Sequence, residues 1–155
     1  METSLLYNKI SFNNKNRRPN INKEKVSNWL QNISKREGYE IVDLNYTFCS
    51  DDSLLDINIQ YLNHNYYTDI ITFDLSDVPR EIEGDIYISI DRVKENAKLI
   101  HSSFEIELMR VIAHGLVHLI GYKDKTKADS KRMRNKEEEC LLLYGEFHVP
   151  REIER

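Results

Sequence analysis

The chain has 155 residues, 40% of them hydrophobic, and a formal net charge of −4. These values suit one globular domain with its own core, exclude a largely disordered chain, and argue against broad nonspecific nucleic-acid binding. No basic stretch with a long apolar run opens the sequence and no apolar stretch reaches membrane-spanning length, so we expect one domain over residues 1–155 that stays in the cytoplasm.

The first part of the chain predicts two strands with a helix between them. The strands are expected at 3–12 and 40–49, the second because apolar and polar residues alternate along it. From about 20 to 35, apolar residues recur at helical spacing and end before Gly38; they are Val26, Trp29, Leu30 and Ile33. This stripe should cover one face of a sheet.

The middle of the chain predicts three further strands, at 54–62, 69–75 and 85–90. In 54–62 the prediction rests on alternation of apolar and polar residues, namely Leu55, Asp56, Ile57, Asn58 and Ile59. With the strands described above, these segments indicate a mixed sheet of four or five strands.

The remaining segments predict helices. Helical spacing of apolar residues extends over 89–100, from Ser102 to Gly121, and over about 128–144. The helix that begins at Ser102 has the form of a capping box, because Glu105 follows three residues later. The predicted fold class is therefore α+β, a mixed four- to five-stranded sheet packed with about five helices.

The sequence contains two cysteines, Cys49 in a predicted strand and Cys140 in a predicted helix. They are far apart and form no C-x-x-C pair of the kind that binds metal or exchanges disulfides. We expect both to be thiols of the core.

Two histidines are spaced as metal ligands on the helix that ends at Gly121. His114 and His118 are four residues apart, so their imidazoles lie on one face of the helix and can reach a single ion. Taken alone, the pair is also compatible with two structural histidines. The run continues to Asp124 as H-x-x-x-H-x-x-G-x-x-D, the spacing of the metzincin zinc motif with aspartate as third ligand.

Gly121 would allow the chain to turn so that the third ligand of this motif can reach the metal. Two ligands lie on a straight helix, so a third can reach the same ion only if the chain turns sharply, and glycine permits this by adopting a positive φ. We therefore predict a metal site formed by His114, His118 and Asp124. Zinc is the first choice, but an aspartate ligand makes manganese or iron possible.

The ligand number and the residue after the first histidine constrain the chemistry. Three protein ligands leave a fourth position for water, which is the arrangement of catalytic zinc sites. Metallopeptidases with this motif carry a glutamate general base directly after the first histidine, whereas this chain has Gly115. The pattern favours a hydrolase and disfavours a peptidase.

The run from His114 to Asp124, HGLVHLIGYKD, resembles the H-G-x-L-H-L-x-G-Y-D-H signature of the YbeY endoribonuclease family. Met133 and Glu137 resemble the methionine and glutamate that follow the signature. Two upstream segments, 68–73 (TDIITF) and 84–89 (GDIYIS), resemble the family's T-D-V-L-S-F and G-D-I-x-I-S strands in the right order. The resemblance covers about residues 55–145.

The resemblance implies a mixed sheet surrounded by helices and a metal-dependent endoribonuclease specific for single-stranded RNA. Its expected role is the maturation of ribosomal RNA, including the 3′ end of the small-subunit rRNA, and ribosome quality control, with ribosome-associated proteins as possible partners. Two features depart from the family pattern. Asp124 stands where most members have a third histidine, and the stretch from 62 to 67 is shorter than usual and lacks the family's arginine.

Positive residues suggest how a phosphodiester could be bound. Arg110, one turn before His114, is the candidate catalytic residue, because it could replace the missing arginine in stabilising charge on a phosphoryl group. The alternative is that Arg110 is an ordinary surface arginine. Residues 123–136 form a basic run against two aspartates, either an RNA-docking surface or a solvated helix face; they include Lys123, Lys125, Lys127, Lys131, Arg132, Arg134 and Lys136. A second group could extend that track: Lys15, Arg17, Arg18, Lys23 and Lys25.

Three functions therefore compete. The leading hypothesis is an endoribonuclease acting on single-stranded rRNA, the second is a zinc metallopeptidase, and the third is a ribosome-assembly factor whose metal is mainly structural. Gly115 argues against the second. His64 is interpreted as an ordinary polar residue that could also line the cleft, because it precedes the predicted strand at 69–75.

Overall fold

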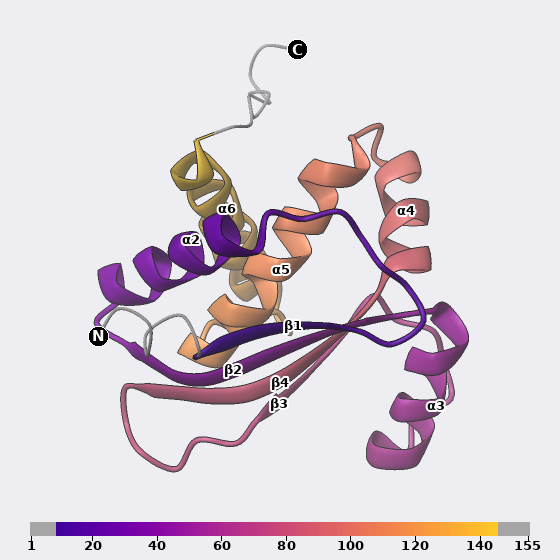
Figure 1. Ribbon diagram of the computed structural model, residues 1–155, viewed down its shortest axis with the longest axis horizontal. Helices are drawn as coiled ribbons and strands as arrows, with labels where there is room; N and C mark the ends of the chain where they lie inside the picture. Colours follow the sequence, from indigo (N-terminus) through magenta and orange to yellow (C-terminus); the bar gives the residue numbers. More distant parts are fainter. Residues whose placement is uncertain (1–8, 146–155) are drawn as a thin grey trace.

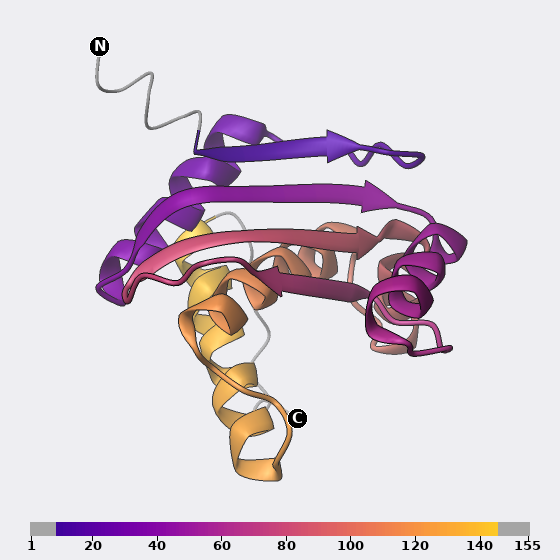
Figure 2. The same ribbon diagram turned by 90° about the horizontal axis from the view of Figure 1, so that it is seen from below.

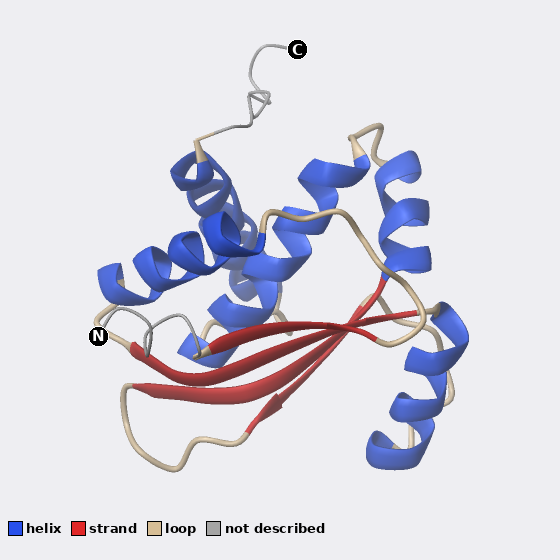
Figure 3. Ribbon diagram, in the orientation of Figure 1, coloured by secondary structure: helices blue, strands red, loops and turns tan. Residues whose placement is uncertain are grey.

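The computed structural model describes residues 9–145 and confirms the predicted α+β class. A four-stranded sheet carries five helices within these residues (Figure 3). The strands are β1 (Ile10–Asn14), β2 (Glu40–Cys49), β3 (Ile70–Asp74) and β4 (Glu81–Ser89). The helices are α2 (Lys23–Arg36), α3 (Asp51–Leu62), α4 (Ile90–Leu99), α5 (Phe104–Ile120) and α6 (Lys127–Tyr144).

The sheet is mixed, with strand order β1-β2-β4-β3. β1, β2 and β4 are parallel, and β3 runs antiparallel to β4 at one edge (Figure 2). Ile86 lies opposite Tyr46 of β2 on one side and Thr72 of β3 on the other. The edge strand β3 follows the loop after α3.

The main core lies between one face of the sheet and the helices α2, α4, α5 and α6, which Figure 1 shows together above the strands. Two hydrogen bonds from aromatic side chains fix this layer. Tyr46 donates to the carbonyl oxygen of Ile112 in α5 at 2.8 Å, and Trp29 of α2 donates to that of Cys140 in α6 at 2.7 Å. The other face is covered at one end by α3 through a smaller apolar cluster, which contains Cys49, Leu54, Ile57 and Ile71. Both cysteines are buried free thiols, as predicted.

The predicted strand at 54–62 is wrong, because this segment belongs to helix α3. The Ser50 hydroxyl accepts a hydrogen bond from the backbone N–H of Ser53 and caps the helix, and Asp51 and Asp52 place negative charge in its first turn. Leu54, Ile57 and Asn58 are buried at helical spacing. The alternation of apolar and polar residues around Asp56 predicted a strand with Ile59 on its buried face, but Ile59 is exposed.

The other boundaries need smaller corrections. The first described strand begins at Ile10 and extends beyond the predicted end at residue 12; positions 3–8 lie outside the described residues. The cap of α5 is Ser103 and not Ser102, because the Ser103 hydroxyl accepts the N–H of Ile106. No helix within residues 9–145 is both long and apolar enough to cross a lipid bilayer.

Two glycines let α5 lie close against the sheet. A Cβ at Gly84 of β4 would stand 2.8 Å from the carbonyl oxygen of Phe73 and 2.9 Å from Leu119 Cδ1. At Gly115 of α5 it would stand 2.8 Å from Ile86 Cδ1. Side chains at these positions would push the helix away from β3 and β4, so the two glycines determine the depth at which the histidines of α5 sit.

Candidate metal centre

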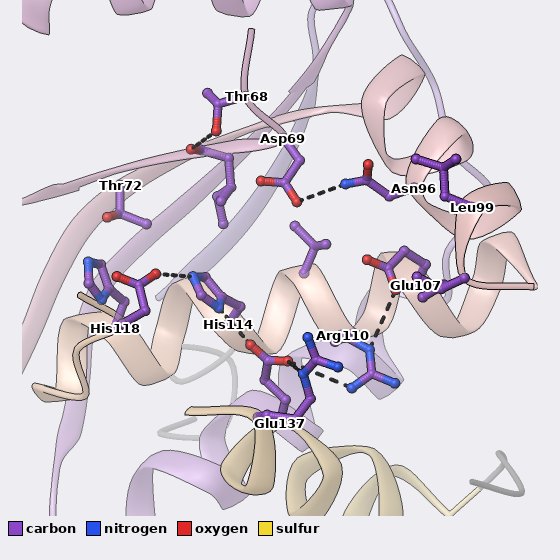
Figure 4. Close-up of a pocket in the computed structure, with 15 residues that line it drawn as sticks. Thr68, Asp69, Thr72, Asn96, Leu99, Glu107, Arg110, His114, His118 and Glu137 are labelled. Atoms are coloured by element: carbon purple, nitrogen blue, oxygen red, sulfur yellow. Dashed lines mark hydrogen bonds and ion pairs between the residues drawn. The ribbon is translucent and has the colours of Figure 1, made fainter. Parts of the chain in front are cut away.

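A cleft of about 500 Å³ opens between β3, α4, α5, α6 and the loop that joins α5 to α6. Its lining includes the three predicted ligands, His114, His118 and Asp124, and also Arg110. Further polar residues complete it: Thr68, Asp69, Thr72, Asn96, Glu107, Arg134 and Glu137. The tertiary structure thus brings all the predicted site residues into one cavity (Figure 4).

The local geometry of the histidine pair follows from the helix. His114 and His118 are on α5, and their rings are nearly parallel with centroids 5.9 Å apart. Gly121 ends the helix with φ 122, the positive value expected for the turn. After this turn the chain reverses, so that Asp124 Oδ2 comes within 3.7 Å of His114 Nε2.

Hydrogen bonds leave the same nitrogen of both imidazoles available. His118 Nδ1 is 2.8 Å from the carbonyl oxygen of Tyr122, and His114 Nδ1 is 2.7 Å from Glu137 Oε2. Carbonyl and carboxylate oxygens only accept, so each Nδ1 carries a proton, and in the neutral ring each Nε2 presents a lone pair. This is the orientation of metal-binding histidines whose second nitrogen is held by an oxygen partner.

The donor set of the cleft fits a divalent transition metal. Two imidazole nitrogens and a carboxylate oxygen match the ligand types of zinc and of manganese or iron. No group of three His, Cys, Asp or Glu side chains within residues 9–145 already has the spacing of a formed centre. Asp124 is the most exposed of the three, at 46% against 21% for His114, so its carboxylate has the most room to move toward the imidazoles.

The charges around His114 favour its positive form when no metal is bound. Burial lowers its pKa, but the hydrogen bond and charge of Glu137 and the charges of Asp69 and Asp124 outweigh that effect, so the pKa is raised. The surroundings of this imidazole therefore stabilise positive charge, whether it is a proton or a cation at Nε2.

A family model described as Endoribonuclease YbeY matches residues 11–145 of the chain. The chain belongs to the YbeY endoribonuclease family. A protein named Endoribonuclease YbeY from Cytophaga hutchinsonii is 58% identical over 118 residues, covering 76% of this chain and 82% of the relative. One of the same name from Flavobacterium johnsoniae is 45% identical over 140 residues, covering 90% and 98%.

The fold comparison agrees with this membership in the YbeY family. A solution structure of a Thermotoga maritima protein superposes with a TM-score of 0.61 at 29% sequence identity. The match covers 87% of this chain and 88% of the other. The similarity to the YbeY family extends further toward the N-terminus than the motifs at about 55–145 indicated, because the family match begins in β1.

Arg110 of this YbeY-family chain is neither a free surface arginine nor an isolated cation. Its Nε is 3.5 Å from Glu107 Oε1 and its Nη1 is 3.7 Å from Glu137 Oε1, with only 17% of the side chain exposed. Figure 4 shows Arg110 between these two carboxylates, with the Glu137 carboxylate between Arg110 and His114. Among the described residues, these atoms of Glu107 and Arg110 have no hydrogen-bond partner, so the contacts are ionic.

Two carboxylates in the cleft were missed by the sequence analysis. Glu107 lies three residues before Arg110 and seven before His114, so helical spacing alone could have assigned it to the same face. Asp69 precedes β3, accepts a hydrogen bond from Asn96 Nδ2 at 3.3 Å, and lies across the pocket from α5 (Figure 4). Burial raises the pKa of Asp69, while the nearby His114 acts to lower it.

Several positive side chains of the basic run at residues 123–136 form ion pairs. Four lysines are exposed, namely Lys123, Lys125, Lys127 and Lys131. Arg132 and Arg134 are also exposed but pair with Asp129 and, at 3.8 Å, with Glu137. Lys136 pairs with Glu37 at 2.5 Å and Glu139 at 3.0 Å. In the second basic group, Arg17 pairs with Asp91 and Lys25 lies over the ring of Tyr144. These contacts give Arg17 and Lys25 structural roles.

Proposed function

We propose that this protein is a metal-dependent endoribonuclease that cleaves single-stranded RNA during maturation of the small-subunit ribosomal RNA in the cytoplasm. The metal would be zinc held by Nε2 of His114, Nε2 of His118 and the carboxylate of Asp124. The observation that carries the proposal is the orientation of the two imidazoles, which present their free nitrogens to a polar cleft that also contains Asp124.

The residues around the proposed ligands suggest their roles in hydrolysis. A bound zinc ion would supply a polarised water and a positive charge for a phosphoryl oxygen. Glu137 holds His114 in the binding tautomer, and Asp69 offers an oxygen acceptor for a proton on the opposite wall. Arg110 remains the candidate for stabilising phosphoryl charge, although Glu107 and Glu137 balance its charge at rest.

The packing of Gly115 argues against the peptidase alternative. A Cβ at Gly115 would stand 2.8 Å from Ile86 Cδ1 and 3.1 Å from Ile70 Cδ1, so a side chain at this position would collide with the sheet. The place at which metallopeptidases carry their glutamate base is therefore occupied by helix–sheet packing.

The openness of the site argues against a mainly structural metal. Structural zinc sites are closed by four protein ligands, whereas here the three proposed ligands border a cleft that accommodates further groups. A catalytic ion needs such an open position for water and substrate.

The test combines metal analysis with cleavage of a labelled single-stranded RNA. We expect about one zinc ion per chain, cleavage that a chelator abolishes, and loss of both metal and cleavage in His114→Ala and His118→Ala, because two ligands hold zinc poorly. A matched control is His101→Ala, an exposed histidine between α4 and α5, which should behave like the parent. Near-stoichiometric zinc in either ligand variant would refute the assignment, and cleavage unaffected by chelator would refute metal dependence.

A further inference from the structure

The five-residue segment 63–67 between α3 and β3 exposes aromatic rings directly before the chain enters the cleft. Tyr66 and Tyr67 are 56% and 49% exposed, and His64 is also exposed. The next two residues, Thr68 and Asp69, line the cleft. The rings therefore stand immediately before the part of the chain that forms one wall of the proposed active site.

These rings are held in place and are not merely loose surface groups. His64 stacks on Tyr66 with ring centroids 5.2 Å apart and planes 19° apart, and the Tyr66 hydroxyl lies 3.0 Å from His64 Nδ1. The buried Asn58 of α3 fixes the backbone beneath them, donating from Nδ2 to the carbonyl oxygen of Tyr66 at 2.9 Å. The carbonyl oxygen of Asn58 also accepts the N–H of His64.

Tyr67 is fixed separately and has a positive charge beside it. Its hydroxyl donates to Asp52 of α3 at 3.2 Å, and the guanidinium of Arg92 from α4 lies over its ring at 5.4 Å. Rings ordered in advance lose little conformational freedom when a ligand stacks on them. These contacts leave both tyrosine rings exposed, so the rings are ordered without being part of a hydrophobic core.

We propose that Tyr66, supported by His64, forms with Tyr67 a stacking platform for an unpaired nucleobase of the RNA strand that enters the cleft. This inference rests on the proposed function and names a binding subsite for its substrate. Single-stranded RNA exposes the flat faces of its bases, and proteins bind them on aromatic side chains with little sequence preference. A duplex hides those faces, so the platform would select single strands without reading their sequence.

The test measures binding of a single-stranded RNA that carries the fluorescent base 2-aminopurine, with chelator present to prevent cleavage. Stacking quenches this fluorophore. Tyr66→Ala should reduce quenching and weaken binding by about 5- to 150-fold, the range for loss of one stacked base. Tyr66→Phe keeps the ring and should bind like the parent, whereas Tyr66→Leu keeps apolar bulk alone and should resemble Tyr66→Ala. Tyr61→Ala removes another exposed tyrosine, whose ring packs edge-on against Phe73, and should leave quenching unchanged.

Different outcomes separate this inference from the proposed function. If the metal-loaded parent cleaves single-stranded RNA but Tyr66→Ala or Tyr66→Leu binds and quenches like the parent, the platform is refuted and the function stands. If the parent neither binds nor cleaves single-stranded RNA, both are refuted. Thermal unfolding of each variant checks that lost binding does not reflect a lost fold.

Discussion

At the scale of single residues, the site depends on the oxygen partner of each histidine. Glu137 is 6% exposed, and its carboxylate contacts both His114 and Arg110. It therefore connects the proposed metal ligand to the buried charges of α5. A residue of this kind positions the site without touching substrate.

Replacing Glu137 tests this positioning role. Glu137→Gln removes the negative charge opposite His114 and should weaken zinc binding by about 10- to 100-fold, the usual effect of losing such a partner. The measurement is competition with a chromophoric chelator. Glu139→Gln changes a largely exposed glutamate of the same helix and should leave zinc affinity unchanged. Equal affinities for Glu137→Gln and the parent would show that the negative charge of Glu137 does not strengthen metal binding at His114.

Asp124 provides a second test at this scale. Asp124→His should keep zinc and shift the pH–rate profile to lower pH, because a neutral nitrogen donor leaves more positive charge on the ion and its bound water ionises more easily. Asp124→Ala should lose activity except in excess zinc. Zinc content and single-turnover RNA cleavage from about pH 5 to 9 bracket the pKa near 7 typical of zinc-bound water. If Asp124→Ala binds zinc and cleaves RNA like the parent, another residue is the third ligand.

At the scale of elements, the position of α5 against β3 and β4 determines whether the cleft exists. α5 carries two proposed ligands and Arg110, while Asp69 comes from the loop directly before β3. Helix and strand can form a common cleft only at a fixed separation, which the small residues at their contact set.

Gly84→Ala tests this close approach. The added methyl would meet Leu119 of α5 and also the backbone oxygen of Phe73 in β3, which cannot move as a side chain can, so we expect a loss of about 1–3 kcal/mol in the free energy of unfolding. Denaturant unfolding measures it. Glu83→Ala, at the neighbouring position of β4, should change stability by about 0.5 kcal/mol or less. An unchanged unfolding midpoint for Gly84→Ala would show that the sheet and α5 are less tightly packed at this point.

At the scale of the whole molecule, charge is distributed unevenly. The chain is acidic overall, yet the start of α6 and the loop before it expose five basic side chains after the proposed ligand Asp124, and Lys123 is exposed directly before it. Figure 2 shows this end of α6 extending away from the sheet, where a long polyanion could reach it. Net charge alone would not indicate this surface.

The salt dependence of RNA binding tests the basic surface. Replacing Lys125, Lys127 and Lys131 together by Ala should weaken binding and reduce the slope of log affinity against log salt by about 2, since each phosphate contact to a single strand contributes about 0.7. Lys35→Ala with Arg36→Ala, at the exposed end of α2, is the control and should leave the slope unchanged. An unchanged slope in the triple variant would assign these lysines to a solvated helix face.

The sequence by itself determined the features that depend on neighbours along the chain. The spacing of His114 and His118, the turn at Gly121 and the apolar stripe of α2 follow from helix geometry, which acts over a few residues. Family membership followed from the same local motifs.

Only the tertiary structure decided the features that join distant segments. The segment from Asp51 to Leu62 alternates like a strand but forms a helix, because its cap and its packing on Ile71 favour one buried stripe over two faces. The pairing of Arg110 with Glu137, and the placement of Asp69 opposite α5, required the positions of three separate elements. Such contacts form only when the sheet and the helices pack together, so residue spacing along the chain does not predict them.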